Sequence, residues 1–178
     1  GVIQSAAITE QLANSVPDNG GVYFVPALTG LGAPYWDQYA RGAIIGITRG
    51  TSVAHLTRAA LEGICYQVYD VLMAMENDIH AKPKEIRVDG GAIANNFLMQ
   101  FQADICRCPV VRPRVLETTA LGAAYLAGLA IDYWKDVDEL KDQWSLDNIF
   151  SAEMHEETAE ALLSEWHKAV GRSLNWVT

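Results

Sequence analysis

The sequence carries few positive charges. Lysine and arginine total 13 against 22 aspartates and glutamates in 178 residues, so the formal net charge is −9. Because a negatively charged body repels the phosphate backbone of DNA or RNA, we expect no nucleic-acid partner. A small anionic ligand is still compatible with this charge, since backbone N–H groups bind phosphate without lysine or arginine.

Cysteine and long apolar runs are also scarce. Cys65, Cys106 and Cys108 do not have the spacing of a disulfide framework or a zinc site, so we expect reduced thiols in a cytoplasmic protein. The sequence shows no signal peptide, and no apolar run reaches the roughly 20 residues of a membrane span. Because the chain starts at Gly1 without a methionine, we expect it to be part of a longer protein.

The sequence lacks the residue patterns of hydrolytic or metal sites. Its four histidines are spread along the chain at His55, His80, His155 and His167. No Ser–His–Asp or Cys–His arrangement is recognisable, and no pair of carboxylates has the spacing of an acid–base couple. Glu62 and Asp70 are expected on a water-facing side of a helix. We therefore predict no catalytic residue and no metal ligand in this chain.

Half of the residues are hydrophobic and a fifth are charged, which is typical of a globular domain. Strand and helix patterns alternate along the chain. The expected strands are 22–26, 43–47, 85–88 and 110–111, and the expected helices are 3–15, 53–77, 95–106, 118–130 and 156–176. This alternation predicts an α/β fold with a mixed sheet, in which we expect strand 85–88 to be central.

Two further stretches give structural expectations. The helix 53–77 has apolar residues at intervals of three or four, which predicts one stripe facing the core. The stripe consists of Val53, Leu56, Ala60, Ile64, Val68, Leu72 and Met75. Residues 134–149 are charged and weakly periodic, and no helix or strand is predicted there.

A strand that runs through two glycines into a helix is the most informative local pattern. Asp89-Gly90-Gly91 follows the expected strand 85–88, and Asn95 stands where a helix-capping residue belongs. Glycines let a flat ligand or a phosphate approach the backbone closely, and the helix start offers N–H groups. A plain capped turn without ligand is the alternative, because the pattern is neither GxGxxG nor a P-loop.

Two other segments are candidates for function. The long loop from Gly30 to Gly42 contains three aromatic residues, which is unusual for a passive connection. Its alternative interpretation is an ordered surface loop with an ion pair between Asp37 and Arg41. The helix 118–130 is rich in small residues, which favour either close core packing or a moving interface.

Together these segments resemble the FGGY family of carbohydrate kinases. The stretch from Gly42 to Ile47, followed by His55 to Glu62, resembles the second signature of the family. The turn at Gly90-Gly91 with its helix is similar to the family's adenosine-binding turn. The loop from Thr29 to Asp37 resembles that of the members that phosphorylate glycerol, and so does the helix segment 119–130.

The resemblance implies an actin-like ATPase (ribonuclease H-like) domain, with a mixed sheet flanked by helices and without its first strands. Residues 1–178 would be part of the family's C-terminal domain, with 134–178 as a C-terminal helical extension. Gly90, Gly91 and Asn95 would bind the nucleotide. The catalytic aspartate, the glycerol-binding residues and the Mg²⁺ ligands would lie upstream of this chain.

The implied activity is ATP-dependent phosphorylation of glycerol to glycerol 3-phosphate, with ATP and Mg²⁺ as cofactors. Glycerol would bind through the domain outside this chain, and the whole protein would be a homo-oligomer. This chain alone would be inactive. Two alternatives stay open, namely a family member that acts on another sugar or polyol, and a non-catalytic nucleotide-binding module with an actin-like fold.

Overall fold

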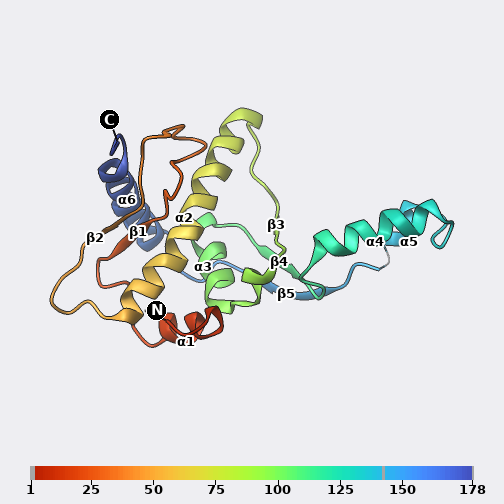
Figure 1. Cartoon of the computed structure of the whole chain (residues 1–178), viewed down its shortest axis with the longest axis horizontal. Helices are drawn as coiled ribbons and strands as arrows, with labels where there is room; N and C mark the ends of the chain where they lie inside the picture. Colours follow the sequence, from red (N-terminus) through yellow and green to blue (C-terminus); the bar gives the residue numbers. More distant parts are fainter. Residues whose placement is uncertain (1–2, 142, 178) are drawn as a thin grey trace.

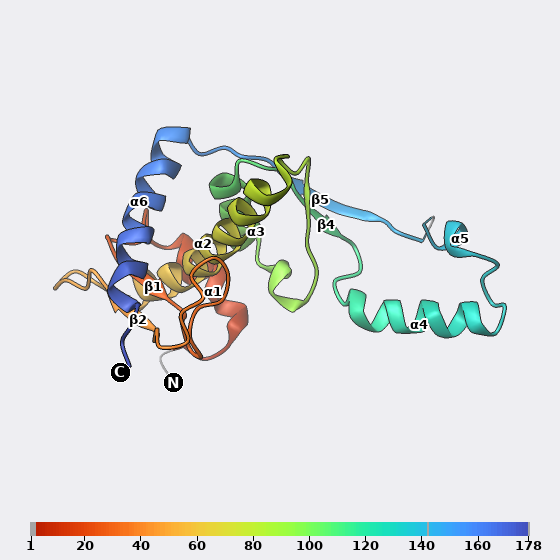
Figure 2. The ribbon, with the colours of Figure 1, turned by 90° about the horizontal axis from the view of Figure 1, so that it is seen from above.

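The computed structural model describes residues 3–141 and 143–177. It consists of a main body and an arm that projects from one side (Figures 1 and 2). The helices are α1 (Thr9–Asn14), α2 (Val53–Ile79), α3 (Asn96–Cys106), α4 (Thr118–Ala130), α5 (Val137–Lys141) and α6 (Glu156–Ser173), with 3₁₀ turns η1 (Ala6–Ile8) and η2 (Gly91–Ala94). The strands are β1 (Tyr23–Val25), β2 (Ala43–Ile45), β3 (Ile86–Arg87), β4 (Val110–Pro113) and β5 (Leu146–Phe150).

The strands of the described residues form two small sheets. β1 and β2 pair antiparallel, with Phe24 opposite Ile44. The other sheet has the order β3-β4-β5, in which β3 is parallel and β5 antiparallel to β4, so this sheet is mixed as predicted. The expectation that strand 85–88 is central is wrong, because β3 lies at the edge. The unpredicted strand β5 occupies the other side of β4, which makes β4 the middle strand.

The core of the body lies where α2, α3 and α6 meet. Trp166 of α6 is fully buried and stacks on Tyr66 of α2, with ring centroids 5.1 Å apart. Phe101 of α3 meets the same Tyr66 ring edge-on at 5.5 Å. Segment 134–178 therefore contributes β5 to the mixed sheet and α6 to this core. By contrast Trp176, which lies beyond the end of α6, is 71% exposed.

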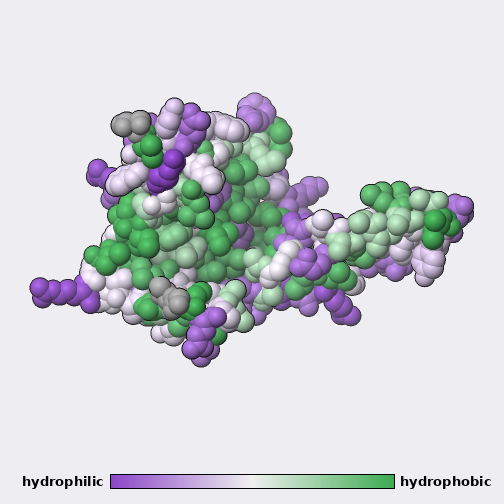
Figure 3. Space-filling view, viewed as in Figure 1, coloured by the Kyte–Doolittle hydropathy of each residue, from purple (hydrophilic) through white to green (hydrophobic). Residues whose placement is uncertain are grey.

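The apolar stripe predicted for α2 does not face this core. Ile64 is 43% and Met75 is 56% exposed, and Val53 and Val68 are exposed as well. The buried face of α2 instead carries Thr57, Ala59, Leu61, Glu62, Gly63, Cys65, Tyr66 and Asp70. The helix has apolar residues on more than one face, and spacing alone does not tell which face is covered. Figure 3 shows apolar residues gathered around α2 on the viewed side.

The arm consists of α4 and α5, and β4 and β5 connect it to the body (Figure 2). Among the described residues of α4 only Gly128 is buried, and it packs against the Trp134 indole. Close packing of small residues is thus present at one position of this helix.

Across the part of the chain that the structure describes, no helix combines the length and the apolar character needed to cross a membrane.

Candidate functional site

The turn predicted to bind nucleotide follows β3, from which Val88 and Asp89 separate it. Gly90 has φ of +86° and ψ of 166°, a backbone region that is essentially restricted to glycine. Its N–H donates to the Leu116 carbonyl oxygen at 2.7 Å, and its own carbonyl oxygen accepts from the Ile93 N–H at 3.2 Å. A Cβ atom built on Gly91 would have only the Glu117 Oε1 atom within 4 Å, at 3.9 Å. The conformation therefore requires glycine at Gly90, whereas Gly91 leaves open space beside the backbone.

Asn95 caps α3, as the sequence predicts. Its Oδ1 accepts from the Leu98 N–H at 3.0 Å, and its Nδ2 donates to Thr9 Oγ1 at 3.2 Å. The Nδ2 group has two N–H bonds, and the described residues accept only one of them. The second N–H is left for a ligand. The capping role and a ligand-binding role are therefore compatible at this position.

The start of α3 offers fewer free N–H groups than the sequence suggests. The Asn96 N–H donates to Glu10 Oε2 at 2.8 Å, and the Asn96 Nδ2 donates to Glu10 Oε1 at 3.0 Å. The Leu98 N–H is occupied by Asn95. Because Glu10 adds a negative charge where the helix dipole would attract an anion, this helix start does not suit a phosphate group. The arrangement fits the uncharged nucleoside part of a nucleotide better.

Gly91 and Asn95 line a pocket of about 530 Å³, and Gly90 lies outside the lining as the bend of the turn. The opposite wall comes from α2 and from the residues around α1. The complete lining is Ala6, Ala7, Thr9, Glu10, Leu61, Ile64, Gly91, Ala92, Ala94, Asn95 and Leu98. Mostly apolar walls with a few polar groups are typical of small-molecule sites. Apolar walls with a few polar groups are compatible with a nucleoside, which combines an apolar base face with a polar ribose.

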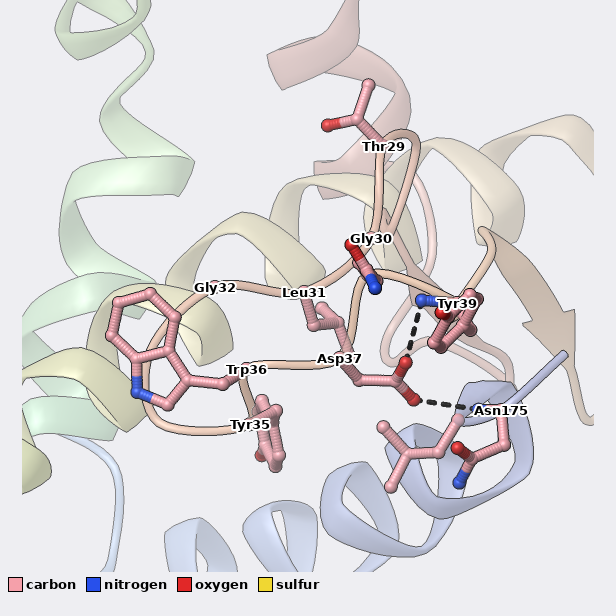
Figure 4. Close-up of a pocket in the computed structure, with 11 residues that line it drawn as sticks. Thr29, Gly30, Leu31, Gly32, Tyr35, Trp36, Asp37, Tyr39 and Asn175 are labelled. Carbon is pink, nitrogen blue, oxygen red and sulfur yellow. Dashed lines mark hydrogen bonds between the residues drawn. The ribbon is translucent and has the colours of Figure 1, made fainter. Parts of the chain in front are cut away.

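The long loop from Gly30 to Gly42, called the aromatic loop below, lies between β1 and β2. It borders a second pocket, of about 690 Å³ (Figure 4). Asp37 Oδ1 accepts from the Tyr39 N–H and Oδ2 accepts from the Asn175 N–H, both at 2.7 Å. These backbone bonds, above all that of Asn175, hold the pKa of the Asp37 carboxyl below its ordinary value. The Arg41 guanidinium donates to the carbonyl oxygens of Gln38 and Ala40, so its hydrogen bonds do not go to Asp37, the partner in the alternative interpretation of an ion pair. The acidic side chain in this pocket thus fastens the loop to the end of α6.

Asp70 of α2 is buried, which corrects the expectation that it faces water. Its Oδ2 accepts from the Tyr35 hydroxyl and from Trp166 Nε1, both at 2.8 Å, and its Oδ1 lies 3.0 Å from His167 Nε2. These partners come from the aromatic loop and from α6. No local sequence pattern predicts this cluster, because the partners lie 35 to 97 residues away.

Glu62 is likewise buried, at 2% exposure, where the sequence suggested a wet face. Its carboxylate accepts from Arg58 Nε and from Asn19 Nδ2, both at 2.8 Å. Burial raises the pKa of the Glu62 carboxyl, and the contacts with Arg58 and Asn19 oppose that shift. Both acids therefore connect elements of the body, and neither one lines the pocket at Gly91.

Comparisons with known proteins agree with the resemblance. Residues 3–131 match the family model for the FGGY family of carbohydrate kinases, C-terminal domain. A glycerol kinase of Parabacteroides distasonis is 85% identical over 176 residues, which cover 99% of this chain and 35% of that protein. Glycerol kinase 2 of Thermotoga maritima is 62% identical over 175 residues, which cover 98% of this chain and 35% of that protein. The chain thus spans about a third of the length of these curated relatives.

Solved structures of the same kind share the fold. The crystal structure of Plasmodium falciparum glycerol kinase with ADP matches with a TM-score of 0.86 at 35% identity, over 97% of this chain and 35% of that chain. Ligand-bound xylulose kinase from Lactobacillus acidophilus matches with a TM-score of 0.76 at 28% identity, over 95% of this chain and 35% of that chain. The predicted actin-like α/β fold is thereby confirmed. The chain belongs to the FGGY family of carbohydrate kinases and matches the family's C-terminal domain.

Proposed function

We propose that the protein transfers the γ-phosphoryl group of ATP to glycerol, and that this chain binds the nucleoside part of ATP through Gly91 and Asn95, with Gly90 shaping the turn. One observation carries the proposal. The pocket beside Gly91 and Asn95 has an apolar wall and a few polar groups, in a chain 85% identical to part of a glycerol kinase. The relative crystallised with ADP, which matches at a TM-score of 0.86, supports nucleotide binding by this fold.

In the proposed reaction, a primary hydroxyl oxygen of glycerol forms a bond to the γ-phosphorus of ATP. The bond between that phosphorus and the β,γ-bridging oxygen breaks, which yields glycerol 3-phosphate and ADP. The hydroxyl proton leaves to a base that we place, with the glycerol contacts, outside this chain. The pocket contributes by holding the adenine and the ribose of ATP, so that the triphosphate starts from a fixed position.

We also propose that the reaction uses Mg²⁺, as phosphoryl transfer from ATP generally does. Within residues 3–141 and 143–177, no three His, Cys, Asp or Glu side chains come together as a metal site. The described residues therefore offer no preformed three-ligand site for this ion. We place its ligands outside this chain and assign no step to it here.

The proposal is tested by a coupled ADP-release assay with the protein expressed from its complete coding sequence. Glycerol, xylulose and gluconate are supplied in parallel with ATP and Mg²⁺. We expect turnover with glycerol to exceed turnover with the two sugars by at least tenfold. A preference for xylulose would favour the alternative of a pentulose kinase. ATP binding without turnover of any substrate would favour the non-catalytic module.

Two further parts of the proposal concern the state of the whole protein. We propose a homo-oligomer, as the family resemblance implies, and light scattering coupled to size-exclusion chromatography measures its mass. We propose a cytoplasmic location, which the three buried free cysteines support because reduced thiols are typical of that compartment. Cell fractionation with an antibody against the protein tests the location.

A further inference from the structure

Asn96, which follows the candidate nucleotide-binding residue Asn95, connects three separate elements of the fold. From α1, Glu10 accepts two hydrogen bonds from it, one from its backbone N–H at 2.8 Å and one from its Nδ2 at 3.0 Å. From β4, Arg112 donates through Nη1 to the Asn96 Oδ1 at 3.0 Å. The amide of Asn96 thus joins a carboxylate on one side to a guanidinium on the other.

Arg112 also holds the other end of the turn. The same Nη1 donates to the Ile93 carbonyl oxygen at 2.9 Å, so one guanidinium nitrogen bonds both to η2 and to the start of α3. Its Nε pairs with Asp147 Oδ2 of β5 at 2.7 Å, and its guanidinium carbon lies 5.0 Å from the centre of the Phe150 ring. The Arg112 side chain is only 12% exposed. A charge fixed by strand contacts therefore anchors the segment between Gly91 and Asn96.

Glu10 belongs to the pocket lining, whereas Asn96 and Arg112 lie outside it. Glu10 and its neighbour Thr9 line the pocket from α1, and Thr9 is the residue that accepts a bond from Asn95. Asn95 already caps α3, so the helix start does not depend on Asn96 for its capping bond. The bonds of Asn96 instead fix how η2 and α3 stand relative to α1, and hence the width of the pocket.

We infer that Asn96, clamped between Glu10 and Arg112, is a positioning residue that holds Gly91 and Asn95 in their binding arrangement before the nucleotide arrives. The inference rests on the proposed nucleotide site. A preorganised site binds more tightly because less ordering is lost on binding. Loosening the clamp should therefore weaken ATP binding while it leaves glycerol binding and the chemical step in place.

The test uses Asn96→Ala and Glu10→Ala in the protein expressed from its complete coding sequence. Calorimetry measures the Kd for ATP, a coupled assay gives KM for glycerol and kcat, and melting without ligand reports stability. We expect the Kd for ATP to rise about three- to tenfold in both variants. For Asn96→Ala, which lies outside the pocket lining, KM for glycerol and kcat should stay within twofold. Glu10→Gln keeps one acceptor oxygen for Asn96 and should give an intermediate Kd. Glu157→Ala, an exposed acid in the first turn of α6, is the matched control and should change none of these values.

The double variant separates a shared clamp from two independent effects. If Glu10 acts through Asn96, the rise in Kd for Glu10→Ala combined with Asn96→Ala stays below the product of the two single rises. Unchanged ATP binding in both single variants would overturn the positioning role, as would an equal rise in KM for glycerol. If the unaltered protein binds ATP but does not phosphorylate glycerol, the proposed reaction fails while the clamp is still judged by Kd. If it binds no ATP, both proposals fail.

Discussion

Replacing Gly91 by valine should block the nucleotide pocket without harming the fold. A Cβ at Gly91 would meet only Glu117 Oε1, at 3.9 Å, so there is room for a side chain in the ligand-free protein. The added isopropyl group would stand where the base approaches the backbone. Loss of roughly 60–100 Å² of apolar contact at about 25 cal/mol per Å² costs about 1.5–2.5 kcal/mol. That cost corresponds to about a 10- to 70-fold rise in the Kd for ATP.

The assay compares the Kd for ATP with the KM for glycerol and with the melting temperature of the ligand-free protein. Gly90→Ala is the companion variant, because its φ of +86° is strained for alanine and should lower stability by about 1–3 kcal/mol. Gly91→Val should instead melt within about 2 °C of the unaltered protein, as substitutions without strain or burial do. If Gly91→Val raises the KM for glycerol while ATP binding stays the same, the turn is a plain structural turn and the nucleotide assignment fails.

Three further predictions concern the body of the fold. Asp70→Asn should lower the free energy of unfolding by about 1.5–3 kcal/mol, because Tyr35 and Trp166 both donate to this buried carboxylate; a loss below about 0.5 kcal/mol in urea denaturation would refute that role. Burial raises the pKa of the Glu62 carboxyl above its ordinary value of 4.5. The stabilisation of the fold that this shift provides is complete below pH 4.5 and is lost as the pH rises through the raised pKa. Glu62→Gln should flatten this dependence of the unfolding free energy on pH, and an unchanged profile would argue against it. Gly171→Ala, at an exposed position within α6 with open space for a Cβ, should raise the unfolding free energy by about 0.5–1 kcal/mol, and a lower melting temperature would contradict this.

Features set by neighbouring residues could be predicted from the sequence. The helix expected over 53–77 is observed as Val53–Ile79, and the helix expected over 118–130 has those same bounds. The Asn95 cap is predictable as well, because a capping bond joins residues only three positions apart. Helix propensity, capping and turn chemistry act over a few residues, so they can be recognised in the local sequence.

Features that depend on distant partners could not be predicted. Glu10 and Asn96 are 86 positions apart in the sequence, so no local sequence pattern indicates that α1 forms part of the pocket wall. β5 is not predicted because four of its five residues are exposed, so its sequence lacks the alternation typical of a half-buried strand. Glu62 is expected to face water because acidic side chains usually do, and the expectation fails because its partner Asn19 lies 43 positions away. In each case the deciding contact is long-range.

The exposed side of α2 has a consequence for how the chain behaves in solution. Ile64, Val68, Val71, Met75 and Ile79 form an apolar strip along the helix, whereas the net charge of −9 makes separate molecules repel one another. Salt shortens the range of that repulsion to about 10 Å at 0.1 M ionic strength, while hydrophobic attraction persists. The colloidal stability of the chain by itself should therefore decrease as sodium chloride is added. Replacing Val68 and Met75 by glutamine should suppress the salt-induced rise in scattered light.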